Sequence, residues 1–149
     1  FFYCKMGSVG RLVVVSGEAA VKATRNRATK DVLQLSKNAI SRLKELKATS
    51  DKPVNRFRLG VKESSGCVGA EYDLVYDDDN LSTKYDEVVT DPESGISVVI
   101  DPKALFYVIG TTMDYQSTLE EEQFVFYNPN ATAVCGCGSS FTVDPRYKE

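Results

Sequence analysis

Residues 56–76 contain two runs of alternating apolar and polar side chains, Arg56-Phe57-Arg58-Leu59-Gly60-Val61-Lys62 and Tyr72-Asp73-Leu74-Val75-Tyr76. This period of two is typical of half-buried β-strands. Between the runs lies Gly66-Cys67-Val68-Gly69. Because glycine permits backbone angles that other residues avoid, the sequence predicts a β-hairpin that carries Cys67 at its tip.

The flanking sequence predicts a helix before this hairpin and several strands after it. Ser36 can cap a helix whose apolar residues recur at helical spacing, namely Ala39, Ile40, Leu43 and Leu46. A short helix is expected between Asp101-Pro102 and Gly110, since Asp caps helices and Pro favours their first turn. Short strands are expected at 88–89, 97–100, 111–115 and 124–127. The expected fold class is α+β, mostly β, with one N-terminal helix and a short second helix.

Length and composition favour one folded domain with an N-terminal arm. The chain has 149 residues, of which 42% are hydrophobic. Residues 1–30 are expected to form a disordered or transit-peptide-like arm, because 5–30 contain six Lys or Arg residues and one acidic residue. Glycines bracket its apolar run at 12–15, so we expect low order through Thr29. Residues 31–149 are expected to form the domain, with a flexible Cys-Gly-Cys tail.

Charge and residue content argue against several classes of protein. The net charge is −3 and no basic face emerges, which disfavours a nucleic-acid partner. The longest apolar runs, 12–15 and 104–109, are far shorter than the roughly 20 residues of a membrane-spanning helix, so no membrane partner is expected. The chain contains no histidine, which excludes Rieske-type sites, His-ligated zinc catalysts and Cys-His protease pairs within it. We expect no catalytic residues.

The remaining motif is Cys135-Gly136-Cys137-Gly138-Ser139-Ser140-Phe141. Its two cysteines are too close for an ordinary disulfide with each other, and free thiols are therefore favoured. Thiolates are the ligands that iron-sulfur clusters prefer, and each iron of a [2Fe-2S] cluster needs two of them from protein. Cys67, Cys135 and Cys137 supply three, so we expect two protomers to share one cluster. Cys4 lies apart from these motifs and is not expected to be a ligand.

In this order and context the motifs resemble those of the A-type iron-sulfur carriers, the IscA/SufA/HesB family. The resemblance covers residues 32–143 and rests on Gly66-Cys67-x-Gly69, Asp101-Pro102-Lys103, Gly110 with Met113-Asp114-Tyr115, Phe124-Val125-Phe126 with Asn128-Pro129-Asn130, and Cys135-Gly136-Cys137-Gly138-x-Ser140-Phe141. It implies a HesB-like compact β-sandwich domain that assembles as a dimer or tetramer. In that family the metal-binding thiols align with Cys67, Cys135 and Cys137.

The resemblance also implies a function. A carrier of this kind receives a [2Fe-2S] or [4Fe-4S] cluster, or iron, and passes it to apo iron-sulfur proteins without catalysing a reaction of its own. Its implied partners are a second copy of the chain, a scaffold protein, and donors of the ferredoxin or glutaredoxin type. Segments 86–89 and 104–106 resemble the mitochondrial carriers, so a mitochondrial location is expected, with a plastid as the alternative.

Several alternatives stay open at the level of sequence. The same thiols could bind mononuclear iron, or could hold zinc in a structural adaptor. A thiol-disulfide oxidoreductase is disfavoured because the chain lacks a Cys-x-x-Cys helix start. The acidic turn 77–79 is expected to be a solvated hairpin tip. Tyr107 and Tyr115 fit either a subunit contact or ordinary core packing.

Overall fold

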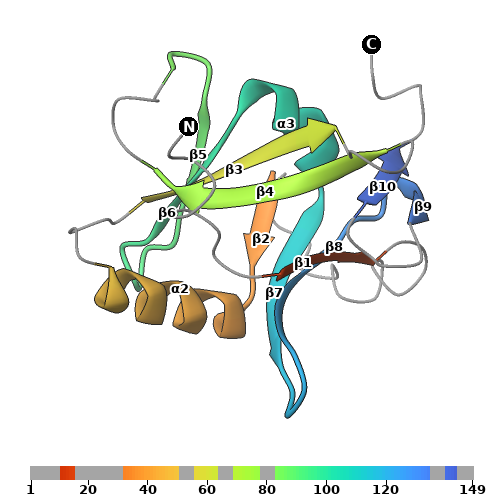
Figure 1. The fold of residues 1–149 in the computed structure, drawn as a ribbon. Coiled ribbons are helices and arrows are strands. Elements are labelled where there is room, and N and C mark those ends of the chain that lie inside the picture. Colours follow the sequence, from red (N-terminus) through yellow and green to blue (C-terminus); the bar gives the residue numbers. More distant parts are fainter. Residues whose placement is uncertain are drawn as a thin grey trace, which may run out of the picture.

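The structure is a computed structural model and describes residues 11–15, 32–50, 56–63, 69–77, 83–134 and 140–143. These residues form two β-sheets and two helices (Figure 1). Neither helix in this part of the chain has the length and apolar character that would be needed to cross a bilayer.

The smaller sheet has the strand order β1-β8-β7-β2, with bounds β1 (Arg11–Val15), β2 (Leu33–Leu35), β7 (Thr111–Ser117) and β8 (Glu122–Tyr127). β7 and β8 form an antiparallel hairpin, while β1 and β2 run parallel to β8 and β7 at the two edges. β1 lies within the arm for which the sequence predicts low order. That prediction is wrong for residues 11–15, and residues 1–10 and 16–31 lie outside the described part.

The larger sheet has the strand order β5-β6-β3-β4-β10-β9. Its strands are β3 (Arg56–Glu63), β4 (Ala70–Tyr76), β5 (Glu87–Thr90), β6 (Ser97–Ile100), β9 (Ala131–Val134) and β10 (Ser140–Val143). β3 and β4 pair antiparallel from Phe57 opposite Tyr76 to Glu63 opposite Ala70, which confirms the predicted hairpin. The sequence pattern did not predict β2, β9 and β10, each of which has only three or four residues.

Both predicted helices are present and begin at the predicted caps. α2 (Lys37–Thr49) starts after Ser36, whose hydroxyl accepts a hydrogen bond from the Ala39 N–H at 3.1 Å. α3 (Pro102–Val108) starts after Asp101, whose carboxylate accepts from the Lys103 N–H at 2.9 Å. These bonds satisfy backbone donors that have no partner within a helix. α2 packs along β7, and α3 packs on β3.

The two sheets and the helices share one hydrophobic core. Its largest fully buried side chains come from both sheets and include Phe57, Leu59, Leu74, Met113, Phe124, Phe126 and Phe141. Removal of this apolar surface from water is the main force that stabilises the fold, at roughly 25 cal/mol per Å². The observed architecture is the predicted one, α+β and mostly β.

Candidate functional site

Four strands of the larger sheet have their ends side by side, at one end of the sheet. Glu63 at the end of β3 pairs with Ala70 at the start of β4, and Ala70 also pairs with Phe141 of β10. Phe141 in turn pairs with Val134 at the end of β9. The four residues therefore form one row across β3, β4, β10 and β9, whose ends gather on the right of Figure 1.

The predicted ligands belong to the two segments that start from this row. Cys67 is in the segment 64–68, between β3 and β4, and Cys135 and Cys137 are in the segment 135–139, between β9 and β10. All three cysteines, and also Cys4, lie outside the described residues. The structure thus describes where both segments are attached, and the ligand assignment itself stays a prediction.

Gly69, directly before β4, lies against the main chain of β10. A Cβ atom on Gly69 would stand 2.9 Å from the carbonyl oxygen of Phe141 and 3.4 Å from its carbonyl carbon. Such a distance to main-chain atoms leaves no space for a side chain. Glycine is therefore required at this position because β4 and β10 approach closely just beyond the cysteine-bearing segments.

The ring of Phe141 anchors the start of β10 in the core. It is 1% exposed and its centroid lies 4.6 Å from that of Tyr72 and 6.0 Å from that of Tyr107, the latter in an edge-on arrangement. Aromatic pairs at these distances stabilise by more than their buried area alone. Tyr107 is thus half-buried against the core, which favours the core-packing interpretation of that residue.

Asn128 fixes the turn from which β9 starts. It is fully buried, and its side-chain amide donates to the Tyr72 hydroxyl at 2.9 Å and to the Tyr107 carbonyl oxygen at 2.7 Å. Its side-chain oxygen accepts from the Asn130 N–H at 2.9 Å. Because a buried amide is costly to leave unpaired, this set of bonds holds the turn in one arrangement.

Tyr72 completes the same network. Its hydroxyl donates to the Tyr107 carbonyl oxygen at 2.6 Å while it accepts from Asn128. Burial raises the pKa of Tyr72, so its hydroxyl stays protonated and remains a donor at neutral pH. From sequence Tyr72 was assigned to the core alone, and Asn128 contributed only to the family resemblance. The Asn-Pro-Asn motif before a strand could have singled out Asn128 as a turn residue, although not its distant partners.

The acidic turn after β4 differs from its prediction. Asp77 is 6% exposed, and its carboxylate accepts from the Arg58 Nε at 3.0 Å. The other end of the Arg58 guanidinium donates to Asp86 at 2.7 Å. Asp77 is therefore a buried ion-pair residue and not part of a solvated tip, because it lies beside Arg56 and Arg58 of the neighbouring strand. Asp78 and Asp79 lie outside the described residues.

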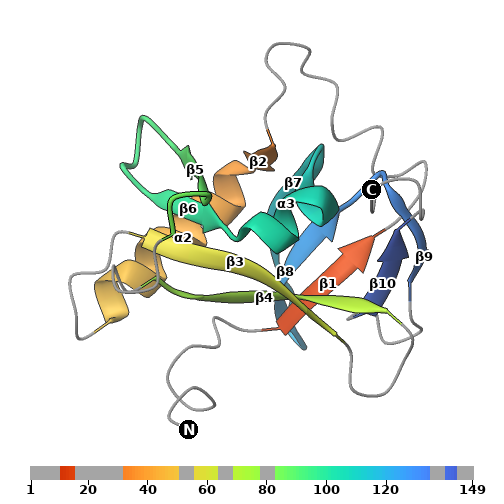
Figure 2. The same cartoon turned by 90° about the horizontal axis from the view of Figure 1, so that it is seen from above.

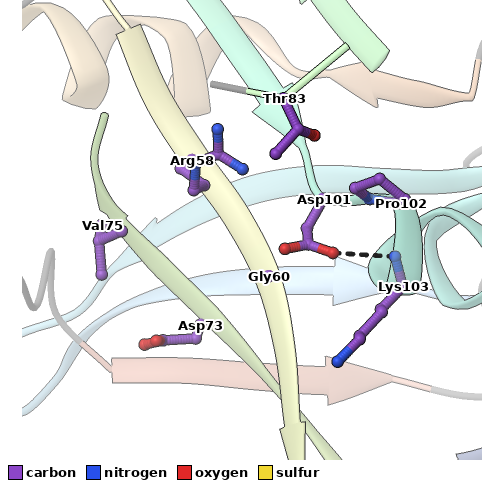
Figure 3. Close-up of a pocket in the computed structure, with 8 residues that line it drawn as sticks. All are labelled: Arg58, Gly60, Asp73, Val75, Thr83, Asp101, Pro102 and Lys103. Carbon is purple, nitrogen blue, oxygen red and sulfur yellow. Dashed lines mark hydrogen bonds between the residues drawn. The ribbon is translucent and has the colours of Figure 1, made fainter. Parts of the chain in front are cut away.

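A hollow of about 470 Å³ lies on the outer face of β3 and β4 (Figure 3). Its lining residues are Arg58, Gly60, Asp73, Val75, Thr83, Asp101, Pro102 and Lys103. The Arg58 guanidinium in it already donates to two carboxylates, those of Asp77 and Asp86. In the part of the chain that the structure describes, no group of three or more Cys, His, Asp or Glu residues is placed to hold a metal. The described lining of the hollow therefore provides no metal site of its own.

Comparison with known proteins decides the family. A family model for iron-sulphur cluster biosynthesis matches residues 32–139. The chain belongs to this family. An Arabidopsis thaliana member named iron-sulfur assembly protein IscA-like 3, mitochondrial, is 46% identical over 113 residues, which are 76% of this chain and 96% of the relative.

Two solved structures, of IscA and of SufA, are similar to the chain. A crystal structure of IscA with a [2Fe-2S] cluster aligns with a TM-score of 0.64 at 27% identity and covers 75% of this chain and 98% of IscA. The structure of Escherichia coli SufA, which is involved in biosynthesis of iron-sulfur clusters, aligns with a TM-score of 0.59 at 30% identity and covers 79% and 98%. These matches confirm the A-type carrier family and the HesB-like fold.

Proposed function

We propose that the protein binds an iron-sulfur cluster, [2Fe-2S] or [4Fe-4S], through Cys67, Cys135 and Cys137 and passes it to apo-proteins. The observation that carries the proposal is the row formed by Glu63, Ala70, Phe141 and Val134. Both cysteine-bearing segments are attached to this one row, although about 70 residues separate them in the chain. Membership in the family supports the same function.

The covalent reach of the chain is compatible with a shared site. Neighbouring strands lie about 4.8 Å apart, so the attachment points at Ala70 and Val134 are about 10 Å from each other. Cys135 directly follows Val134, and Cys67 is three residues before Ala70. Since one residue spans at most about 3.8 Å, the thiols of both segments can reach a common point beyond the edge of the sheet.

A second copy of the chain completes the ligand set. A cluster bound only by protein thiolates needs four of them, and the two motifs supply three. A homodimer, or a tetramer built from dimers, can share a cluster between two such sets. A cluster held between subunits is also easier to release than one enclosed by four cysteines of a single chain, and release is what a carrier requires.

Transfer proceeds by stepwise exchange of thiolate ligands. A cysteine of the acceptor loses its proton and forms a bond to iron, and one carrier cysteine leaves the iron and takes up a proton. Each exchange keeps the coordination number of the iron, so no free iron is formed. The chain acts on no covalent bond of a substrate and is not an enzyme. A scaffold or a ferredoxin- or glutaredoxin-type donor loads it, and apo iron-sulfur proteins unload it.

The proposed location is the mitochondrion. It is supported by the Arabidopsis relative, whose name carries that location, at 46% identity. The alternative is a plastid. Expression of the natural full-length protein with a fluorescent C-terminal tag separates the two, since overlap with a chloroplast stroma marker alone would contradict the mitochondrial assignment.

Anaerobic reconstitution with iron and sulfide tests the proposed ligands. Cys67→Ser, Cys135→Ser and Cys137→Ser should each abolish the visible absorbance of the cluster, and the control Cys4→Ser should keep it. An unchanged cluster yield in Cys135→Ser would contradict the assignment. Iron and acid-labile sulfide in equal amounts support a cluster, whereas iron without sulfide indicates a mononuclear iron donor. Stoichiometric zinc with no transfer to an apo-ferredoxin indicates a structural adaptor.

A further inference from the structure

β1 is an addition to the part of the chain that matches the family. The family match begins at residue 32, whereas β1 spans Arg11–Val15. The strand pairs in parallel with β8 over its whole length, from Arg11 opposite Gln123 to Val15 opposite Tyr127. Without β1, the outer edge of β8 would present unpaired backbone groups.

Two side chains of β1 face the core. Leu12 and Val14 pair with Phe124 and Phe126, whose side chains are fully buried. Val14 is 3% exposed and belongs to the core cluster, and Leu12 packs against that cluster. The burial of these side chains holds the strand on the domain.

The carboxyl end of β1 reaches the turn that leads to the cysteine pair. The Asn128 N–H donates to the Val15 carbonyl oxygen at 3.0 Å, which extends the pairing one residue beyond β8. The side-chain amide of Asn128 is held from the other side by Tyr72 and Tyr107. Figure 2 shows β1 beside β10, with β9 next to it, and β1 contacts both strands.

We propose that β1 is a positioning strand for the turn at Asn128, from which β9 leads toward Cys135 and Cys137. It supplies the backbone acceptor for Asn128 and contacts β9 and β10. Loss of β1 would leave the N–H of a buried asparagine without its protein acceptor, and the turn before β9 would then be free to shift. The expected effect of β1 on cluster binding rests on the proposed function. Its effect on the turn at Asn128 does not.

Amide hydrogen exchange of the apo full-length chain tests the structural part. In Val14→Asp, which places a charge in the core under β1, exchange at Asn128 and in β9 and β10 should become about tenfold faster or more, while β5 keeps its protection. Val88→Asp is the matched control, because Val88 is exposed in β5, and it should leave β9 and β10 unchanged. If Val14→Asp also deprotects β5 and so unfolds the domain, Val14→Thr gives a milder perturbation of the same site.

Unchanged protection of β9 and β10 in a folded Val14 variant whose β1 amides exchange freely would overturn the proposal. The second readout is the rate at which a chelator removes the cluster from the reconstituted protein, which should rise about tenfold in the Val14 variant and not in Val88→Asp. If the wild-type protein assembles no cluster, the proposed function fails while the exchange result still decides the role of β1. If the cluster assembles but both rates are unchanged, only the role of β1 fails.

Discussion

Gly69 lies against the main chain of Phe141, and this contact joins the two halves of the candidate site. A side chain on Gly69 would collide with the carbonyl group of Phe141, whose Cα is paired with that of Ala70. The segment with Cys67 ends directly before Gly69, and the segment with the cysteine pair ends directly before β10. Both segments are therefore attached where β4 and β10 approach each other closely.

Gly69→Ala should destabilise the domain and reduce cluster yield. The added Cβ has to push β10 away from β4, and crowding of this kind costs about 1–3 kcal/mol of the free energy of unfolding. Urea unfolding of the apo-protein measures the loss. Gly60→Ala is the control, since its Cβ would stand 3.9 Å from the Asp73 carbonyl oxygen, an ordinary contact, and it should change stability by no more than about 1 kcal/mol. Equal stability of the two variants would contradict the steric argument.

Tyr72→Phe should destabilise more than Tyr76→Phe. The Tyr72 hydroxyl bonds to both Asn128 and the Tyr107 carbonyl oxygen, so its removal leaves a buried amide short of one acceptor and costs about 1–3 kcal/mol. Among the described residues, the Tyr76 hydroxyl bonds to the Leu46 carbonyl oxygen at 3.5 Å, and loss of this long bond should cost less than about 1 kcal/mol. Thermal unfolding compares the two variants, and the reverse order would show that the network does not stabilise the turn.

Asp86→Asn should weaken the domain at neutral pH and have little effect near pH 2. Burial opposes ionisation of the Asp86 carboxyl, but hydrogen bonds from Arg58 and Thr83 outweigh it and lower the pKa of Asp86 from 3.8 to about 2. A lowered pKa in the folded state gives stability that is present above about pH 4 and is lost as the pH falls toward about 2. The shift corresponds to about 2 kcal/mol.

The measurement for Asp86 is urea unfolding of both proteins across that pH range. The wild type should lose stability relative to Asp86→Asn between about pH 4 and pH 2, and the two curves should converge at the acidic end. Parallel curves would mean that Asp86 titrates alike in the folded and unfolded states. The ion pair between Arg58 and Asp86 would then contribute nothing to the pH dependence of stability.

Short sequence patterns predicted those elements that depend on residues close together in the chain. The hairpin of β3 and β4 follows from alternation, and both helices follow from the caps at Ser36 and Asp101. β1 was not predicted, because the four apolar residues 12–15 become part of a strand only through pairing with β8, more than 100 residues later. The burial of Asp77 likewise depends on Arg58, in the neighbouring strand.

The candidate site also has a part that the sequence predicted and a part that it did not. Cysteines on glycine-rich segments are visible in the sequence, and their order carried the family resemblance that the comparisons confirm. The row of strand ends depends on the pairing of β10 with β4, which no local pattern contains. The role of Asn128 was also out of reach, because its partners come from β1, from β4 and from the end of α3.

Native mass spectrometry of the anaerobically reconstituted protein tests the central claim most directly. Two chains should carry one cluster, as a dimer or as the unit of a tetramer, and Cys67→Ser, Cys135→Ser and Cys137→Ser should each yield chains without a cluster. A single chain that carries a complete cluster, or a Cys135→Ser dimer that keeps it, would contradict the account.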